Sequence, residues 1–166
     1  MTGGTGTWVV YAPAAVFLLF TPTRAAAVLE QHFAWLRDKP VTCDGYSGYP
    51  SLTGTIQWDF VHVLRKAEKL AVDGVDAGDE ARYDMLKCLY HDAKQVRTPA
   101  PRAIADLTRR AHALAASYKD HEMRTYLANA IPDLFTFLEH PGMSPHSNDV
   151  ARQDQADAAP LIPAIA

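Results

Sequence analysis

The sequence predicts an α/β chain in which a first part of short strands and one helix is followed by a block of helices. Two different patterns of apolar residues predict this division. Before residue 58, apolar runs have strand length and are rich in β-branched and aromatic residues. From Asp59 onward, apolar residues recur at spacings of three and four, as on one face of a helix. The composition, 48% hydrophobic and 21% charged over 166 residues, excludes a wholly disordered chain and a collagen-like fibre.

Two apolar runs near the start predict a β-hairpin. Residues 7–11 and 16–20 both have strand length, and Pro13 lies in the short turn between them. Because both runs are continuously apolar, we expect the hairpin to be buried on both faces.

The next segment predicts one helix and a third strand. Residues 24–38 have helical spacing, with Thr23 as the expected N-cap, and Pro40 ends the helix. Residues 41–43 then form a short apolar run that we expect to be a strand ending at Asp44.

The remainder of the chain predicts a helical block. Apolar residues mark helices over 59–73, 80–96, 101–118 and 123–138. Gly74 is expected to close the first of these, and Pro132 must kink the last or begin a new helix. Residues 153–166, rich in Ala, Asp and Pro, are expected to be a frayed or disordered tail.

Charge and cysteine usage limit the class of protein. Sixteen basic and nineteen acidic residues give a formal charge of −3, which excludes a strongly basic nucleic-acid coat but not a local basic face. Cys43 and Cys88 form no disulfide framework, and we expect both to be small buried hydrophobes in a reducing compartment. The longest apolar stretch, residues 8–20, is too short to span a membrane and follows no basic residue, so we expect a cytoplasmic protein.

Asp44 is the most informative candidate for chemistry. A carboxylate that ends a buried strand before a glycine turn occupies the usual position of a metal ligand in an open α/β sheet. The alternative is an ordinary Asp-Gly turn. The glycine-rich start, residues 3–6, lacks the Lys-Ser/Thr of a phosphate loop and is interpreted as a flexible start.

The other polar groups allow two interpretations each. Asp59 and His62, three residues apart, are either a helix N-cap with a polar neighbour or a catalytic pair. Six basic residues form either a solvated helix face or a face that contacts phosphates. They are Arg97, Arg102, Arg109, Arg110, Lys119 and Arg124.

Four segments, taken in order, carry a family resemblance. They are residues 41–49, 57–68, 89–94 and 134–142, the last running into 147–152. Together they resemble the catalytic region of insertion-sequence transposases of the DDE class, in the variant whose ribonuclease H-like core is interrupted by a helical insertion. The similarity covers about residues 7–152.

This resemblance implies a fold and a mechanism. The fold is a partial ribonuclease H-like sheet of two or three strands, without its first strand, and with a large all-α insertion. Residues 1–58 would be the partial core, 59–133 the insertion, 134–152 a returning core helix and 153–166 the tail. In the family, three carboxylates hold two divalent ions, normally Mg²⁺, for phosphodiester cleavage and strand transfer of transposon-end DNA.

The resemblance also assigns site residues. Asp44 matches the second acid of the triad, a catalytic metal ligand. His62 and Arg65 match polar positions expected to shape the site or contact DNA, and Asn148 and Arg152 match the Asn-Asn…Glu-Arg segment.

Two departures lead us to expect no activity from this chain alone. No acidic residue precedes Glu30, so the first acid of the triad is missing, and Ala151 stands where the third acid is expected. Asp149, two residues away, would face another side of a helix. Expected partners are transposon DNA and a second copy or a full-length transposase, with no membrane.

Two alternatives remain at this stage. One is a non-catalytic DNA- or protein-binding remnant that modulates a full-length transposase. The other is an unrelated helical protein in which residues 8–20 form a helix. Without its first strand, the sheet would expose an edge beside residues 8–11, so we expect a dimer or a covered edge.

Overall fold

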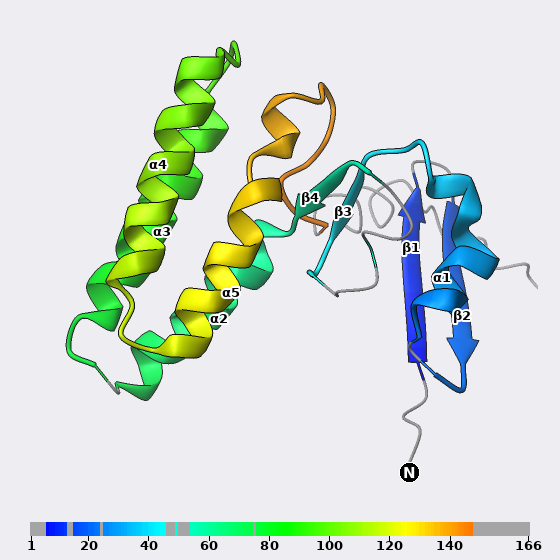
Figure 1. Ribbon diagram of the computed structural model, residues 1–166, viewed down its shortest axis with the longest axis horizontal. Coiled ribbons are helices and arrows are strands. Elements are labelled where there is room, and N and C mark those ends of the chain that lie inside the picture. Colours follow the sequence, from blue (N-terminus) through cyan, green and yellow to red (C-terminus); the bar gives the residue numbers. More distant parts are fainter. Residues whose placement is uncertain are drawn as a thin grey trace, which may run out of the picture.

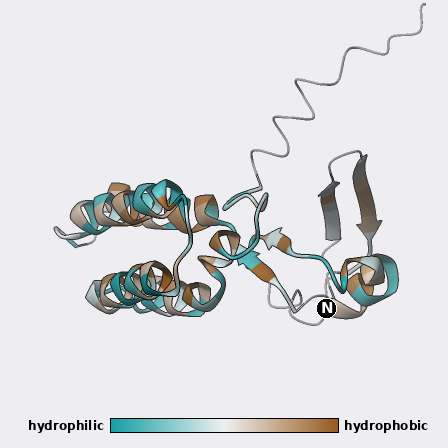
Figure 2. Cartoon of the chain, turned by 90° about the horizontal axis from the view of Figure 1, so that it is seen from above, coloured by the Kyte–Doolittle hydropathy of each residue, from teal (hydrophilic) through white to brown (hydrophobic). Residues whose placement is uncertain are grey.

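The computed structural model describes residues 6–12, 15–23, 25–45, 49, 54–74 and 76–147. It is a mixed α/β protein that is mostly helical, with two small sheets. The helical bundle and the N-terminal hairpin lie at opposite ends of the molecule, with a short pair of parallel strands between them (Figures 1 and 2). Within the described residues, no helix has the length and apolar character needed to cross a membrane.

The predicted hairpin is confirmed. Strands β1 (Gly6–Ala12) and β2 (Ala15–Thr21) pair antiparallel, with Trp8 opposite Leu19. This pairing excludes the alternative in which residues 8–20 form a helix. Helix α1 (Ala26–Phe33) and a 3₁₀ turn (Ala34–Leu36) follow. They bury a small cluster against the hairpin that consists of Trp8, Leu29, Phe33 and Leu36.

Two expectations for this unit are wrong. The hairpin is not buried on both faces, because Leu18 is 62% exposed and Phe20 is 74% exposed. Alternate side chains of a strand point to opposite faces, and α1 covers only the face that carries Trp8. The N-cap residue of α1 is Ala25, not Thr23, although the Thr23 hydroxyl accepts a hydrogen bond from the Ala25 amide at 3.2 Å.

The predicted third strand is confirmed, but it belongs to a second sheet. β3 (Val41–Cys43) pairs in parallel with β4 (Ile56–Trp58). The single sheet of two or three strands is therefore wrong for the described residues, which form two separate two-stranded sheets. β4 was not predicted, because a run of three residues containing Gln57 has no readable periodicity.

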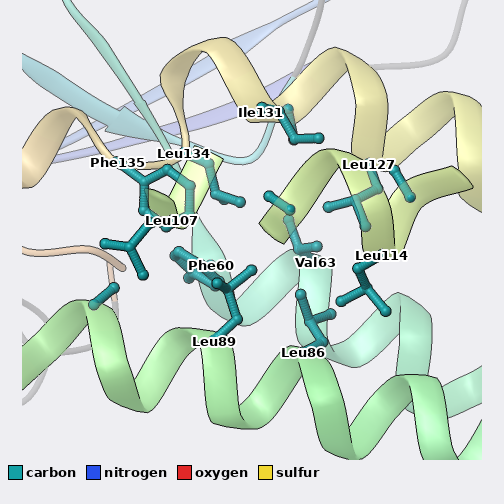
Figure 3. Close-up of a cluster of buried hydrophobic side chains, with 14 of the residues drawn as sticks. Phe60, Val63, Leu86, Leu89, Leu107, Leu114, Leu127, Ile131, Leu134 and Phe135 are labelled. Carbon is teal, nitrogen blue, oxygen red and sulfur yellow. The ribbon is translucent and has the colours of Figure 1, made fainter. Parts of the chain in front are cut away.

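The helical block is confirmed, but its last helix is shorter than the predicted 123–138, because it ends at Ala130 and a 3₁₀ turn (Ile131–Asp133) contains Pro132. The helices are α2 (Phe60–Asp73), α3 (Asp79–Gln95), α4 (Pro101–Ser117) and α5 (His121–Ala130). All four contribute to one apolar core, part of which is drawn in Figure 3. As predicted, Gly74 ends α2 in the left-handed conformation, at φ +65°.

The segment after α5 differs from the expected returning helix over 134–152. Residues 134–147 contain only a 3₁₀ turn (Thr136–Leu138) followed by turns and bends. Buried Gln57 of β4 explains this path, because its side-chain amide donates to the Leu134 carbonyl at 2.9 Å and accepts from the Phe137 amide at 2.7 Å. The rest of the expected helix and the 153–166 tail lie outside the described residues.

Candidate functional site

A cavity of about 620 Å³ lies between the hairpin unit and the β3–β4 pair. Its apolar wall comes from β1, α1 and the 3₁₀ turn after α1. Its opposite wall comes from β3, the start of α2 and residues 140–147. The polar side chains that line it include Asp44, His62 and Ser147.

Asp44 directly follows β3 and is exposed at the cavity. Asp59 directly follows β4, and its amide donates to the Cys43 carbonyl at 2.8 Å. The two aspartates therefore follow the carboxyl ends of two parallel strands, which is where ligand sites of α/β sheets form. Asp44 has the strand-ending position that the metal-ligand interpretation requires, and Gly45 after it has φ +78°, as the turn interpretation requires.

The turn after Asp44 is fixed by the packing of Trp58. Gly45 has φ +78°, and a Cβ on this residue would lie 2.1 Å from Cζ2 of the Trp58 ring. Only glycine fits such a position. The Trp58 indole in turn donates to the Tyr126 hydroxyl of α5 at 3.4 Å. The bundle thereby supports the turn that positions Asp44.

Asp59 is 1% exposed and is occupied by protein donors. Its Oδ1 accepts from the Val61 amide at 2.8 Å, as an N-cap does. Its Oδ2 accepts from the Ser147 amide at 3.1 Å and the Ser147 hydroxyl at 2.6 Å. Burial alone would raise the pKa of Asp59, but the hydrogen bonds from Ser147 and Val61 and the nearby His62 hold it below its usual range.

His62 lines the same cavity as Asp44. Its Nδ1 is 3.2 Å from Asp59 Oδ2, and its side chain is 40% exposed. Arg65, one helical turn further along α2, is exposed and does not line the cavity. Asn148 and Arg152 lie outside the described residues, whereas the preceding residue, Ser147, lines the same cavity as Asp44.

Cys43 is buried and is influenced by the charges of three aspartates. Burial raises the pKa of the Cys43 thiol to about 12, and the charges of Asp44, Asp133 and Asp59 act in the same direction. The thiol is therefore protonated at neutral pH and is no nucleophile. In the part of the chain that the structure describes, no three His, Cys, Asp or Glu side chains are placed to hold a metal ion.

Three of the six members of the basic set form ion pairs, as the solvated-face interpretation predicts. Arg109 pairs with Asp106, Arg110 with Asp92 and Lys119 with Asp76, all within one chain. Ion pairs of this kind lie on the surface and contribute little to stability. Cys88, expected to be buried, is exposed on α3.

Sequence reasoning missed how residues 144–147 complete the site. The Thr42 hydroxyl donates to the Ser144 carbonyl at 3.0 Å, and the Phe60 amide donates to the Pro145 carbonyl at 3.0 Å. With the Ser147 bonds to Asp59, these contacts hold the segment against β3 and the start of α2. No local signal reveals partners so distant in sequence.

Comparison with known families identifies the chain. The model of the IS66 transposase family matches residues 4–153. This match spans most of the 166 residues, and the chain belongs to the IS66 family of transposases. No curated protein and no solved structure matches the sequence.

Proposed function

We propose that this IS66-family chain acts in DNA transposition but does not cleave or join DNA by itself. In this proposal, residues 1–58 and 134–152 belong to a ribonuclease H-like core of the DDE class, and residues 59–133 are its helical insertion. The observation that carries the proposal is the donor set around Asp44. This set offers one exposed strand-ending carboxylate, and the nearby Asp59 carboxylate is already occupied by Ser147 and Val61.

Two-metal phosphoryl transfer needs more ligands than this. Two divalent ions about 3.5–4 Å apart must neutralise charge on the attacking and leaving oxygens, which requires several carboxylates in fixed positions. In sequence, Ala151 occupies the place of the third acid. The described residues therefore do not fit a pair of Mg²⁺ ions, and we assign this chain alone no metal-dependent step.

The remaining roles follow from position. Asp44 would supply one ligand if a complete site formed with another transposase chain. His62, which lines the same cavity, would shape that site, and exposed Arg65 would contact a DNA phosphate. Asn148 and Arg152 keep the roles that the family pattern assigns to them. The expected partners are transposon-end DNA and a full-length transposase, in the cytoplasm.

The test is a cleavage and strand-transfer assay on transposon-end DNA with Mg²⁺ or Mn²⁺. We expect the chain and its Asp44→Ala variant to give the same background. A full-length active transposase serves as the positive control for the substrate. Product formed by the chain and lost in Asp44→Ala would overturn the proposal.

A second candidate is a non-catalytic remnant that binds a protein partner. In support of this candidate, three of the six basic residues, Arg109, Arg110 and Lys119, pair with carboxylates of the same chain. Gel-shift titration over a salt series separates the two, because phosphate contacts give a steep negative slope of log affinity against log salt. We expect a shallow slope, and a steep one would favour DNA binding.

A further inference from the structure

One side of helix α2 carries a row of basic side chains that begins at the cavity. Counted from His62, its members follow at spacings of three, four and seven residues, which places them on one face of a helix. They are His62, Arg65, Lys66 and Lys69. We call these four residues the α2 row. The core residues of α2, Phe60, Val63 and Ala67, lie on the opposite side of the helix.

The α2 row leads away from Asp44. His62 lines the cavity together with Asp44, and α2 then runs away from β4 along the bundle (Figure 1). The helix between His62 and Lys69 spans about 10 Å, at about 1.5 Å per residue. Phosphates of one strand of duplex DNA follow one another at about 3.4 Å along the duplex axis. The row is therefore long enough for about three consecutive phosphates.

The charges of the α2 row are available to a partner. Arg65 and Lys69 are exposed, and neither takes part in a salt bridge among the described residues. Lys66 pairs with Glu122 of α5, whose side chain is 80% exposed. Because an exposed ion pair contributes little, a phosphate can replace Glu122 at Lys66. Asp73, one turn beyond Lys69, reverses the charge and marks the end of the row.

We propose that the α2 row binds consecutive phosphates of one strand of duplex DNA and directs that strand away from Asp44. The inference rests on the proposed function, in which Arg65 contacts a phosphate, and adds Lys66, Lys69 and the path of the DNA. Arg65 offers a fork of donors for phosphate oxygens, and each lysine offers a point charge. Such contacts position the duplex without reading its sequence.

An acidic protein surface is the other partner that a basic row could attract. Protein interfaces, however, depend on a few buried aromatic, apolar or arginine anchors in well-packed pockets. None of the four positions of the α2 row carries an aromatic or apolar side chain. Evenly spaced cations on one helix face match the regular charge of a phosphate backbone better.

The test is fluorescence anisotropy of a short labelled duplex of mixed sequence, titrated with the chain at salt concentrations from about 50 to 200 mM. Each neutralised phosphate contributes about 0.9 to the slope of log affinity against log salt, so the three cations should give a shallow slope of about −2.7. Arg65→Gln and Lys69→Gln should each reduce its magnitude by about 0.9, and the double variant by about 1.8.

Arg102→Gln is the matched control. Arg102 is an exposed residue of α4, outside the α2 row, and forms no salt bridge with another described residue. This variant should leave the slope unchanged, and polyglutamate should compete less well than unlabelled duplex of equal total charge. No binding at about 50 mM salt, an unchanged slope in the double variant, an equal reduction by Arg102→Gln, or equal competition by polyglutamate would overturn the inference.

The inference and the proposed function are tested by separate measurements, because anisotropy detects binding without cleavage. Product formed in the cleavage assay would overturn the proposed lack of activity and leave the slopes of the variants unaffected. Unchanged slopes without cleavage would overturn only the inference about the α2 row.

Discussion

The helical bundle and the sheet side of this molecule differ in how completely their apolar side chains are buried. In the bundle, α2 to α5 share one core whose members, among them Phe60, Val63 and Leu127, are fully buried. On the sheet side, the described residues give the hairpin a core of four buried side chains and form two separate sheets, and Leu18 and Phe20 are exposed. We therefore expect most of the stability to come from the bundle, whereas the candidate site lies beside the less buried sheet side.

The largest expected difference between the two regions is in the loss of stability when a buried phenyl ring is removed from each. Phe60 is fully buried, with ring centroids 4.8 Å from Tyr90 and 5.8 Å from Phe135. Phe60→Ala should cost about 3–5 kcal/mol of unfolding free energy, because the surrounding core cannot fill the space that the deleted ring leaves. Phe33→Ala, at the edge of the existing cavity, should cost about 2 kcal/mol or less. Urea unfolding measures both, and equal losses would contradict the account.

Asp59 lies between β4 and α2, and its replacement should cause the next largest loss of unfolding free energy. Asp59→Ala removes the N-cap of α2 and leaves the Ser147 donors without their acceptor. We expect a loss of about 2–4 kcal/mol from the cap and the hydrogen bonds together. Asp120→Ala, which removes only the N-cap of α5, is the matched control and should cost about 1 kcal/mol. Similar losses in the two variants would show that the Ser147 contacts contribute nothing.

The turn after Asp44 gives a smaller but position-specific effect. Gly45→Ala introduces a Cβ against the Trp58 ring at a positive φ and should cost about 1–3 kcal/mol. Gly54→Ala is the control, because a Cβ there meets nothing within 4 Å. Thermal unfolding compares them. If Gly45→Ala is as stable as Gly54→Ala, Trp58 does not fix this turn.

The smallest expected effect is the pH dependence of the stabilisation that the Asp59 carboxylate provides. Since the folded pKa of Asp59 lies below its ordinary value of 3.8, this group stabilises the fold above that value and loses its contribution as pH falls through the folded pKa. The stability difference between the chain and Asp59→Asn should therefore be greatest above pH 3.8 and shrink below it. Urea unfolding over a pH series checks this, and a difference that grows on acidification would contradict it.

The elements that the sequence predicted well are those with long periodic patterns. Helices α2 to α5 carry several turns of apolar residues, and their caps at Asp59 and Gly74 are local signals. The hairpin was predicted for the same reason, but its exposed face was not. Burial of a face depends on what packs against it, and strand sequence alone does not reveal that partner.

The site could be predicted only in part. Asp44 was found because a strand end followed by glycine is a local pattern. Other features of the site depend on contacts between residues far apart in sequence. Gln57 of β4 bonds to Leu134, 77 positions away, and Asp59 bonds to Ser147, 88 positions away. Local periodicity contains no information about such pairs.

The proposed lack of activity depends on the inference that the described residues around Asp44 supply too few ligands for a catalytic metal ion. The most direct measurement is a Mn²⁺ titration of the chain, with free Mn²⁺ followed by electron paramagnetic resonance, and the same titration of Asp44→Asn. We expect neither protein to show a saturable site at millimolar Mn²⁺. A saturable site in the chain that disappears in Asp44→Asn would contradict it.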